Sequence, residues 1–412
     1  MRIAVWHNLP SGGGQRALFD HVRGLVRRGH ELEIWAPPTA DNSLLDFRTI
    51  APYHEVGLRR AQSFRYKRLP YGSDLGIRAD IKAMDSHCAE VAQEISRKPF
   101  DVLLSGSCAR FGAPRIARWV TLPSVLYLGE PLRRLYESPS VWALRPTDRS
   151  LPGLARAAYD VVHVQRLRLQ VREERANAKA FRTILVNSLF SAESVARAYG
   201  LPSRVCYLGV DPALWDIGPR EPERLAVGIG EFGPHKGIDF VLRALALSDR
   251  PCPELHWVGN RANPDYLKRL CMQAESLHVA FTPHVAVPQA ELTALLRRAA
   301  FLVYAPHLEP FGYAPLECAA AGLPTIAVAE GGIRETVENN VTGLLVAREV
   351  DAMAAAINML IGDSQQAALL GKAARQAAYS RWAVEDAVTR LETELEQALA
   401  TSLRATEVVT NG

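Results

Sequence analysis

The sequence lacks the signatures of several common protein classes. Its six cysteines are scattered and none forms a Cys-x-x-Cys pair, which argues against a zinc site and against a disulfide framework. The chain starts with an apolar run too short for a signal peptide, and it contains no stretch of about eighteen uncharged apolar residues free of Gly and Pro. We therefore expect a cytoplasmic protein without a membrane-spanning helix.

A phosphate-loop motif is also missing. Ser11 is followed by three glycines, but no Gly-Lys-Ser/Thr comes after them and the spacing is not G-x-G-x-x-G, so ATP binding is not indicated. A glycine-rich turn after the first strand still suits a ligand that lies against the backbone. Gly13 and Gly14 are therefore candidate binding residues, and a plain tight turn before a helix at residues 15–28 is the alternative.

The chain is long enough for two domains. Its 412 residues exceed what one hydrophobic core usually serves, so two domains of about 200 residues each are expected. Strand and helix patterns alternate in both halves, as in α/β proteins with parallel sheets. A connector with Pro and Gly at residues 217–222 predicts an N-terminal domain at residues 1–210 and a C-terminal domain at residues 221–381.

The two halves differ in charge. Residues 1–210 carry 31 Lys and Arg against 19 Asp and Glu, whereas residues 211–412 carry 17 against 25. A basic half favours an anionic partner, such as a lipid phosphate or the inner face of a membrane. The basic and aromatic segment 57–70 can lie on such a surface, and a solvated charged loop explains it equally well. Nucleic acid is disfavoured, because aromatic and basic residues are not interleaved in the way that stacks bases.

The most informative stretch is residues 301–346. It predicts a buried strand at 301–304, a helix to about residue 321, a second strand at 325–328 and a Gly-Gly turn that opens another short helix. In such a unit, the loops at the carboxyl ends of the strands form the ligand crevice.

Two kinds of group in this crevice can bind a ligand. The backbone amides of Phe311, Gly312 and Tyr313 lie at a helix amino end, where an anion or a set of hydroxyls is attracted. Glu309 before the bend and Glu317 one turn into the helix can both face the crevice. The alternative is that Glu309 is a solvated loop residue and Glu317 part of a helix surface.

The order of these residues resembles a known family. The spacing Glu309-Pro-Phe-Gly-Tyr-Ala-Pro-Leu-Glu317, followed by Ala-x-Gly-x-Pro and Gly-Gly-x-x-Glu, is similar to that of the retaining nucleotide-sugar glycosyltransferases of family 4. The resemblance implies an α/β protein of the GT-B fold, with two Rossmann-like domains facing a central cleft. It also implies that a last helix at residues 382–400 packs back on the acceptor-binding N-terminal domain.

The resemblance implies a reaction and its residues. A hexose-like sugar would pass, with retention, from a nucleotide-diphosphate sugar to a lipid-linked sugar, a polysaccharide or another glycan, without a cofactor or a metal. Lys236, just before a helix start, would stabilise the leaving diphosphate, and Glu309 would orient the sugar. Glu317 would grip the ribose, and His284 and Val285 stand where relatives hold the nucleotide base. No Asp-x-Asp occurs, which argues against a metal-dependent enzyme of the GT-A fold.

Two positions depart from the family pattern. Glu231 stands where relatives carry the Arg of Gly-Arg-x-x-x-x-Lys-Gly, and a carboxylate there repels a diphosphate unless it is paired or turned away. Gly129 stands at the His of Tyr-x-His-x-Pro, and its neighbour Glu130 is the candidate binding residue in the N-terminal domain. The alternative function is therefore a catalytically inert GT-B module that binds a sugar nucleotide or a partner glycosyltransferase. The spacing of Glu309 and Glu317 disfavours an epimerase or a phosphorylase-like enzyme.

Overall fold

The structure is a computed structural model that describes residues 1–58, 74–136 and 151–410. Most of segment 57–70, for which the sequence leaves a bilayer surface and a solvated loop equally open, falls outside these residues. Among the described residues, no helix is both long enough and apolar enough to span a bilayer.

The chain divides into two compact units. Unit 1 comprises Met1–Asn187, Ser191–Tyr207 and Val388–Gly412. Unit 2 comprises Ser188–Phe190 and Leu208–Ala387.

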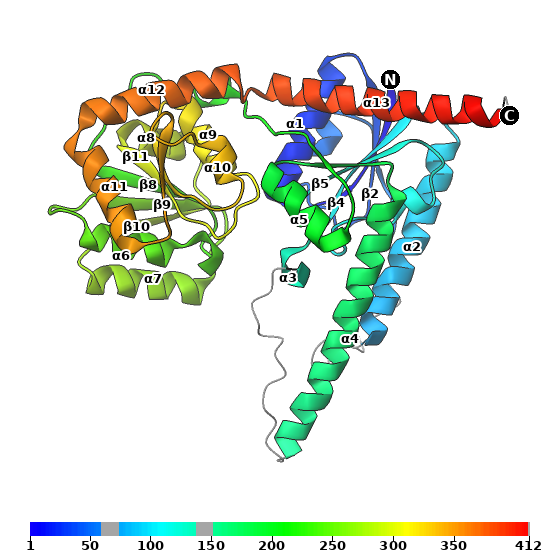
Figure 1. The fold of residues 1–412 in the computed structure, drawn as a ribbon, viewed down its shortest axis with the longest axis horizontal. Coiled ribbons are helices and arrows are strands. Elements are labelled where there is room, and N and C mark those ends of the chain that lie inside the picture. Colours follow the sequence, from blue (N-terminus) through cyan, green and yellow to red (C-terminus); the bar gives the residue numbers. More distant parts are fainter. Residues whose placement is uncertain (59–73, 137–150, 411–412) are drawn as a thin grey trace. The chain divides into compact units, whose positions relative to one another are not determined.

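Unit 1 is built on a parallel sheet of seven strands in the order β3-β2-β1-β4-β5-β6-β7 (Figure 1). The strands are β1 (Arg2–Asn8), β2 (Glu31–Ala36), β3 (Tyr53–Glu55), β4 (Val102–Cys108), β5 (Ser124–Gly129), β6 (Thr183–Val186) and β7 (Arg204–Val205). Its main helices are α1 (Gly13–Arg27), α2 (Asp74–Ser96), α4 (Leu151–Ala180) and α5 (Leu189–Tyr199), with a short α3 (Arg133–Tyr136). Successive β1 residues from Ile3 to Trp6 are all buried, as expected for a parallel strand with both faces covered.

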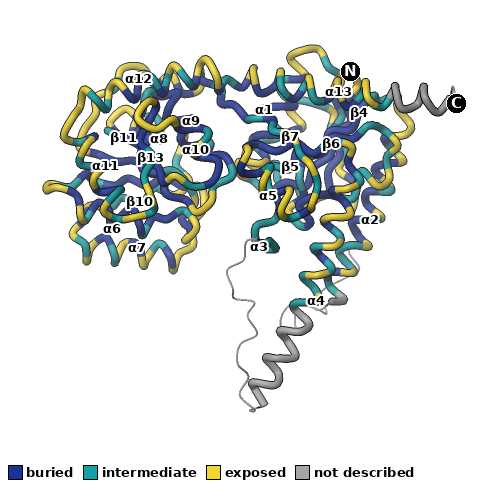
Figure 2. The backbone as a smooth tube through the Cα atoms, in the orientation of Figure 1, coloured by how far each residue is buried: buried dark blue, intermediate teal, exposed yellow. Residues whose placement is uncertain are grey.

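Unit 2 has a parallel sheet of six strands in the order β10-β9-β8-β11-β12-β13. The strands are β8 (Leu225–Ile229), β9 (Glu254–Gly259), β10 (Phe281–Val285), β11 (Phe301–Tyr304), β12 (Thr325–Val328) and β13 (Gly343–Val346). The helices are α6 (Ile238–Leu247), α7 (Pro264–Ser276), α8 (Gln289–Arg298), α9 (Tyr313–Ala320), α10 (Ile333–Thr336), α11 (Val350–Gly362) and α12 (Ser364–Ser380). Figure 2 shows buried strands in the centre of the unit and helices with exposed outer faces.

Three elements differ from the expected bounds. Helix α1 begins at Gly13, two residues before the predicted start at residue 15. The amides of a first helical turn need no acceptor within the helix, so glycines can occupy it. The sequence predicts a strand at residues 278–283, but strand β10 begins at Phe281, since His278 has a φ of 53° and closes the turn after α7. Helix α13 (Val384–Thr410) continues past residue 400.

Most of helix α13 belongs to unit 1 and packs along α1. A Cβ at Gly24 would lie 2.3 Å from a methyl group of Val388, so the two helices approach closely only because residue 24 is glycine. Leu391 is fully buried. At the end of α1, Arg28 donates to a carboxylate oxygen of Glu392 at 2.6 Å.

Candidate active site

The strand order of unit 2 reverses between β8 and β11. The chain runs outward from β8 through β9 to β10, and it then returns to β11 on the other side of β8. The loops that leave the carboxyl ends of β8 and β11 therefore part in opposite directions, and ligands of open α/β sheets bind at such a point. The loop after β8 carries Lys236, and the loop after β11 carries Glu309.

Lys236 and Glu309, both chosen from the sequence, form an ion pair. Nζ of Lys236 lies 2.8 Å from Oε2 of Glu309. The two side chains are 17% and 19% exposed, so the pair is largely shielded but still within reach of a ligand. A charge-assisted hydrogen bond of this kind is stronger than one between neutral groups. The pair places a cation suited to phosphate beside a carboxylate suited to hydroxyl groups.

The loops that carry this pair are joined through their backbones. Gly237 has a φ of 68°, and a Cβ there would lie 2.3 Å from the carbonyl oxygen of Ala305. Only glycine permits this approach. Next to it, the amide of His307 donates to the carbonyl of His235 at 2.8 Å. The strand ends thus bring the two loops close, and the glycine fixes how they meet.

The turn after β12 holds the backbone of Glu309. The amide of Gly332 donates to the carbonyl of Glu309 at 2.8 Å. Gly331 has a φ of 62°, and a Cβ there would lie 2.2 Å from the same carbonyl oxygen. The Gly-Gly turn therefore lets the loops after β11 and β12 interlock.

Glu317 lies in the second turn of α9 and is only 6% exposed. Burial raises the pKa of Tyr304 well above its ordinary value, and the nearby carboxylates Glu309 and Glu317 raise it further. Both carboxylates therefore lie near the end of β11. Because Glu317 is more buried than Glu309, its carboxylate is less accessible to a ligand.

The helix amino end predicted to hold an anion is present. Helix α9 begins at Tyr313, and Gly312 precedes it with a φ of 92°. A Cβ at Gly312 would lie 2.3 Å from the terminal methyl of Ile333, so the bend needs glycine. Phe311 is buried, so its ring packs inside the unit.

Glu231, the carboxylate at the unexpected position, has a partner. Its Oε1 lies 3.2 Å from Nε2 of His235, four residues further on, and both side chains are nearly half exposed. A protonated His235 neutralises the carboxylate, and a neutral ring can donate a hydrogen bond to it. Either contact reduces the repulsion that Glu231 exerts on a phosphate group.

His284 lies at the end of β10 and is held by two contacts. Its ring stacks on that of His256 at 5.1 Å between centroids, with Nε2 2.9 Å from Nδ1 of His256. Nδ1 of His284 lies 2.9 Å from Oε1 of Glu291 in the first turn of α8. The neighbouring Val285 is 44% exposed. Of these two candidates, Val285 has the more accessible side chain.

In unit 1 the strand order reverses between β1 and β4, and the turn after β1 leads to Gly13 and Gly14. Asp41, which the sequence did not single out, orders this turn by accepting from the amide of Ser11 at 3.3 Å. Glu130 follows β5, and its Oε2 lies 3.8 Å from Nε of Arg133. Gly13 and Gly14 thus begin α1 after the turn that leaves β1, and Glu130 directly follows β5.

Gly129 stands where the family pattern has a histidine. In the described part of unit 1, no exposed histidine near these strand ends takes its place. His7 in β1 is fully buried against Phe47, with 4.5 Å between the ring centroids. Burial lowers the pKa of His7 to about 3, so the ring stays neutral at ordinary pH. His7 therefore cannot act as an accessible proton donor.

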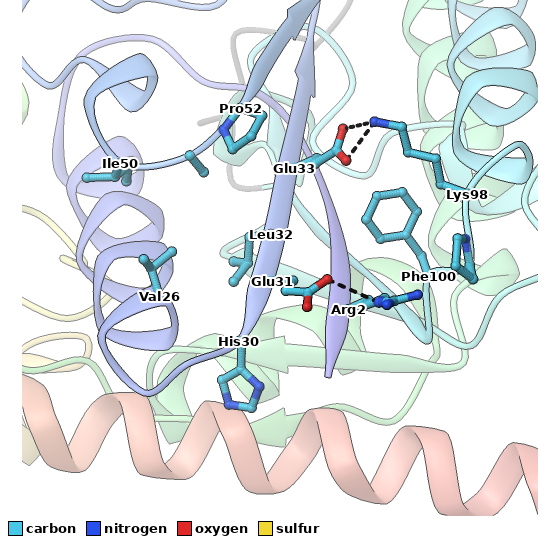
Figure 3. A pocket seen from close by; sticks show the side chains of 12 residues that line it. Arg2, Val26, His30, Glu31, Leu32, Glu33, Ile50, Pro52, Lys98 and Phe100 are labelled. Atoms are coloured by element: carbon cyan, nitrogen blue, oxygen red, sulfur yellow. Dashed lines mark hydrogen bonds and ion pairs between the residues drawn. The ribbon is translucent and has the colours of Figure 1, made fainter.

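A cavity of about 470 Å³ in unit 1 lies at the amino ends of β1 and β2, opposite the strand ends that lead to the candidate residues (Figure 3). Ion pairs between Arg2 and Glu31 and between Lys98 and Glu33 flank it. The cavity is therefore separate from Gly13, Gly14 and Glu130, the candidate residues of unit 1.

The described residues form no group of three or more His, Cys, Asp or Glu that could hold a metal ion.

Sequence reasoning missed Arg348 and its partner Glu330. Arg348 lies two residues past β13 and donates to both carboxylate oxygens of Glu330. Eighteen positions separate the two residues, and no local motif joins them. The only available signal was that Glu330 directly precedes the recognised Gly-Gly turn.

Part of the chain resembles known proteins in sequence. Residues 211–377 match the model of a protein family described as Glycosyl transferases group 1. A glycogen synthase of Mycobacterium tuberculosis is 36% identical over 177 residues, which are 41% of this chain and 42% of the relative. A D-inositol 3-phosphate glycosyltransferase of Mycobacterium tuberculosis is 34% identical over 224 residues, which are 48% and 45%. The chain thus spans less than half the length of these curated relatives.

Solved structures resemble the whole chain. The Anabaena protein Alr3699/HepE in complex with UDP covers 96% of this chain and 100% of its own, with a TM-score of 0.69 and 22% identity. A sucrose-phosphate synthase from Thermosynechococcus elongatus covers 97% and 100%, with a TM-score of 0.71 and 17% identity. These likenesses and the two parallel sheets confirm the predicted α/β GT-B fold with two Rossmann-like domains. The family match adds that residues 211–377 resemble the group 1 glycosyltransferases.

Proposed function

We propose that the protein is a retaining glycosyltransferase of family 4 that moves a hexose from a nucleotide-diphosphate sugar to a glycan acceptor without a metal. The observation that carries this proposal is the ion pair of Lys236 and Glu309 at the strand reversal of unit 2. The pair lies within the residues that match the glycosyltransferase family model.

The geometry supports a separate role for each of these residues. Lys236 neutralises the leaving diphosphate, a form of electrostatic stabilisation worth about 3 kcal/mol for one well-placed donor. Glu309 orients the sugar hydroxyls and faces the positive charge that develops on the sugar. The amino end of α9 binds the sugar and phosphate oxygens through its backbone.

The nucleoside is held by other parts of unit 2. Glu317 accepts hydrogen bonds from the ribose hydroxyls. The segment of His284 and Val285 contacts the base. Because the Anabaena protein was solved with UDP and with UDP-glucose, a uridine diphosphate sugar is the first donor to test.

The acceptor belongs to unit 1 in this proposal, with Glu130 as a residue that contacts it. The basic character of residues 1–210 favours a lipid-linked or otherwise anionic acceptor at a membrane surface. Binding to vesicles should therefore increase with the fraction of anionic lipid and decrease with salt. Co-sedimentation with vesicles tests this. Binding that changes with neither the anionic lipid fraction nor the salt concentration would remove the support for a membrane-bound acceptor.

A second candidate function is an inert module that binds a sugar nucleotide without turnover. The exposed carboxylate of Glu231 favours it, and the contact of Glu231 with His235 counts against it. Hydrolysis of UDP-glucose, GDP-mannose and ADP-glucose by the wild type and by Glu309→Ala separates the two functions. The enzyme should hydrolyse one donor faster than the variant does, whereas equal background rates for all donors would favour the inert module.

A further inference from the structure

Arg348 makes four hydrogen bonds around the loop that carries Glu309. Its Nε and Nη2 donate to the two carboxylate oxygens of Glu330 at 2.6 and 2.7 Å. Its Nη1 donates to the carbonyl of Ala305 at 3.0 Å, and Nη2 also donates to the carbonyl of Pro306 at 2.7 Å. One side chain thus ties the end of β13 and the turn after β12 to the start of the loop after β11.

Glu330 extends this restraint to the residue before Glu309. Its Oε2 accepts a long hydrogen bond from the amide of Leu308 at 3.5 Å. Leu308 has a φ of 48°, a left-handed conformation that a leucine rarely adopts. Such a backbone persists only where the surrounding contacts hold it. The position of Glu309 therefore depends on contacts outside its own loop.

The carbonyl of Ala305 is contacted by both Arg348 and Gly237. Arg348 donates to it, and the backbone of Gly237 packs against it. The loop of Lys236 therefore meets the segment that Arg348 holds. Movement of residues 305–308 would change the distance between Lys236 and Glu309, which is 2.8 Å in the ion pair.

We propose that Arg348, acting through Glu330 and the carbonyls of Ala305 and Pro306, is a positioning residue that holds Glu309 against Lys236. Its effect on turnover rests on the proposed function, whereas its effect on the ion pair does not. Arginine suits this task because its planar group presents N–H donors in a fixed fork, which lysine cannot reproduce.

The first test measures the ion pair without any substrate. The amine of Lys236 must leave Glu309 to react with an acetylating N-hydroxysuccinimide ester, and mass spectrometry gives its rate against the exposed Lys268 and Lys372. Arg348→Gln is the test variant. Arg298→Gln is the matched control, because Arg298 forms a similar two-bond pair with Glu223 near the amino end of β8.

Arg348→Gln should raise the relative acetylation rate of Lys236 severalfold, while Arg298→Gln leaves it unchanged. Glu330→Gln should raise it by a smaller factor, because the arginine keeps its carbonyl contacts, and this variant serves if Arg348→Gln does not fold. An unchanged rate in the folded variant, as judged by circular dichroism, would overturn the proposal.

The second test is a double-mutant cycle on donor hydrolysis. Arg348→Gln should lower kcat with little change in KM, and it should have no further effect in a Glu309→Ala background, since residues that act as a unit are not additive. Additive losses would contradict positioning through Glu309. If the wild type hydrolyses no donor, the proposed function fails, and the acetylation rates still decide the role of Arg348.

Discussion

At the residue scale, the candidate site is held by pairs of opposite charge. Lys236 pairs with Glu309, and Arg348 pairs with Glu330. A buried or half-buried charge that loses its partner is costly, so removal of one member should disturb the other. The site is therefore sensitive to the protonation of Glu330.

Glu330 makes this sensitivity measurable. Hydrogen bonds from Arg348 hold the pKa of Glu330 below its ordinary value of 4.5, against a smaller opposite effect of burial. A carboxyl group with a lowered pKa stabilises the fold above the unfolded pKa, and it loses that contribution as pH falls through the folded pKa. Glu330→Gln should therefore have a lower melting temperature than the wild type at pH 7. The gap should narrow below about pH 4.5, and thermal unfolding with a constant gap would contradict this.

At the element scale, the loops of unit 2 meet through glycines at positive φ. Gly237→Ala forces a left-handed alanine and a contact with the carbonyl of Ala305, and strain of this kind costs about 1–3 kcal/mol. The melting temperature should fall by several degrees. Gly362→Ala is the control, because a Cβ at the end of α11 meets no atom within 4 Å. Equal melting temperatures for the two variants would count against the close approach of the loops.

The sequence predicted the strand-helix-strand order of residues 301–346 because its apolar runs and Gly-Gly turn are local signals. The same stretch led to Glu309, and the position before a helix led to Lys236, without showing that they touch. Their contact depends on a strand order that places β11 beside β8, which no local pattern encodes. The role of Arg348 was hidden for the same reason.

At the scale of the whole molecule, unit 1 is completed by the end of the chain. Leu391 in α13 is fully buried, so Leu391→Ala should leave a cavity that costs about 2–5 kcal/mol. Calorimetry should show a lower unfolding midpoint than for Glu396→Ala, which changes an exposed residue of the same helix. Equal midpoints would show that α13 adds little to unit 1.

The central claim is that Lys236 and Glu309 mark the site of a nucleotide-diphosphate sugar. The most direct measurement is thermal unfolding with UDP, GDP and ADP, each at about a hundred times a plausible dissociation constant, where a bound ligand adds about 2.7 kcal/mol. One nucleotide should raise the melting temperature of the wild type by several degrees and leave Lys236→Ala unchanged, while Lys268→Ala behaves like the wild type. No shift with any nucleotide, or an equal shift in Lys236→Ala, would contradict the claim.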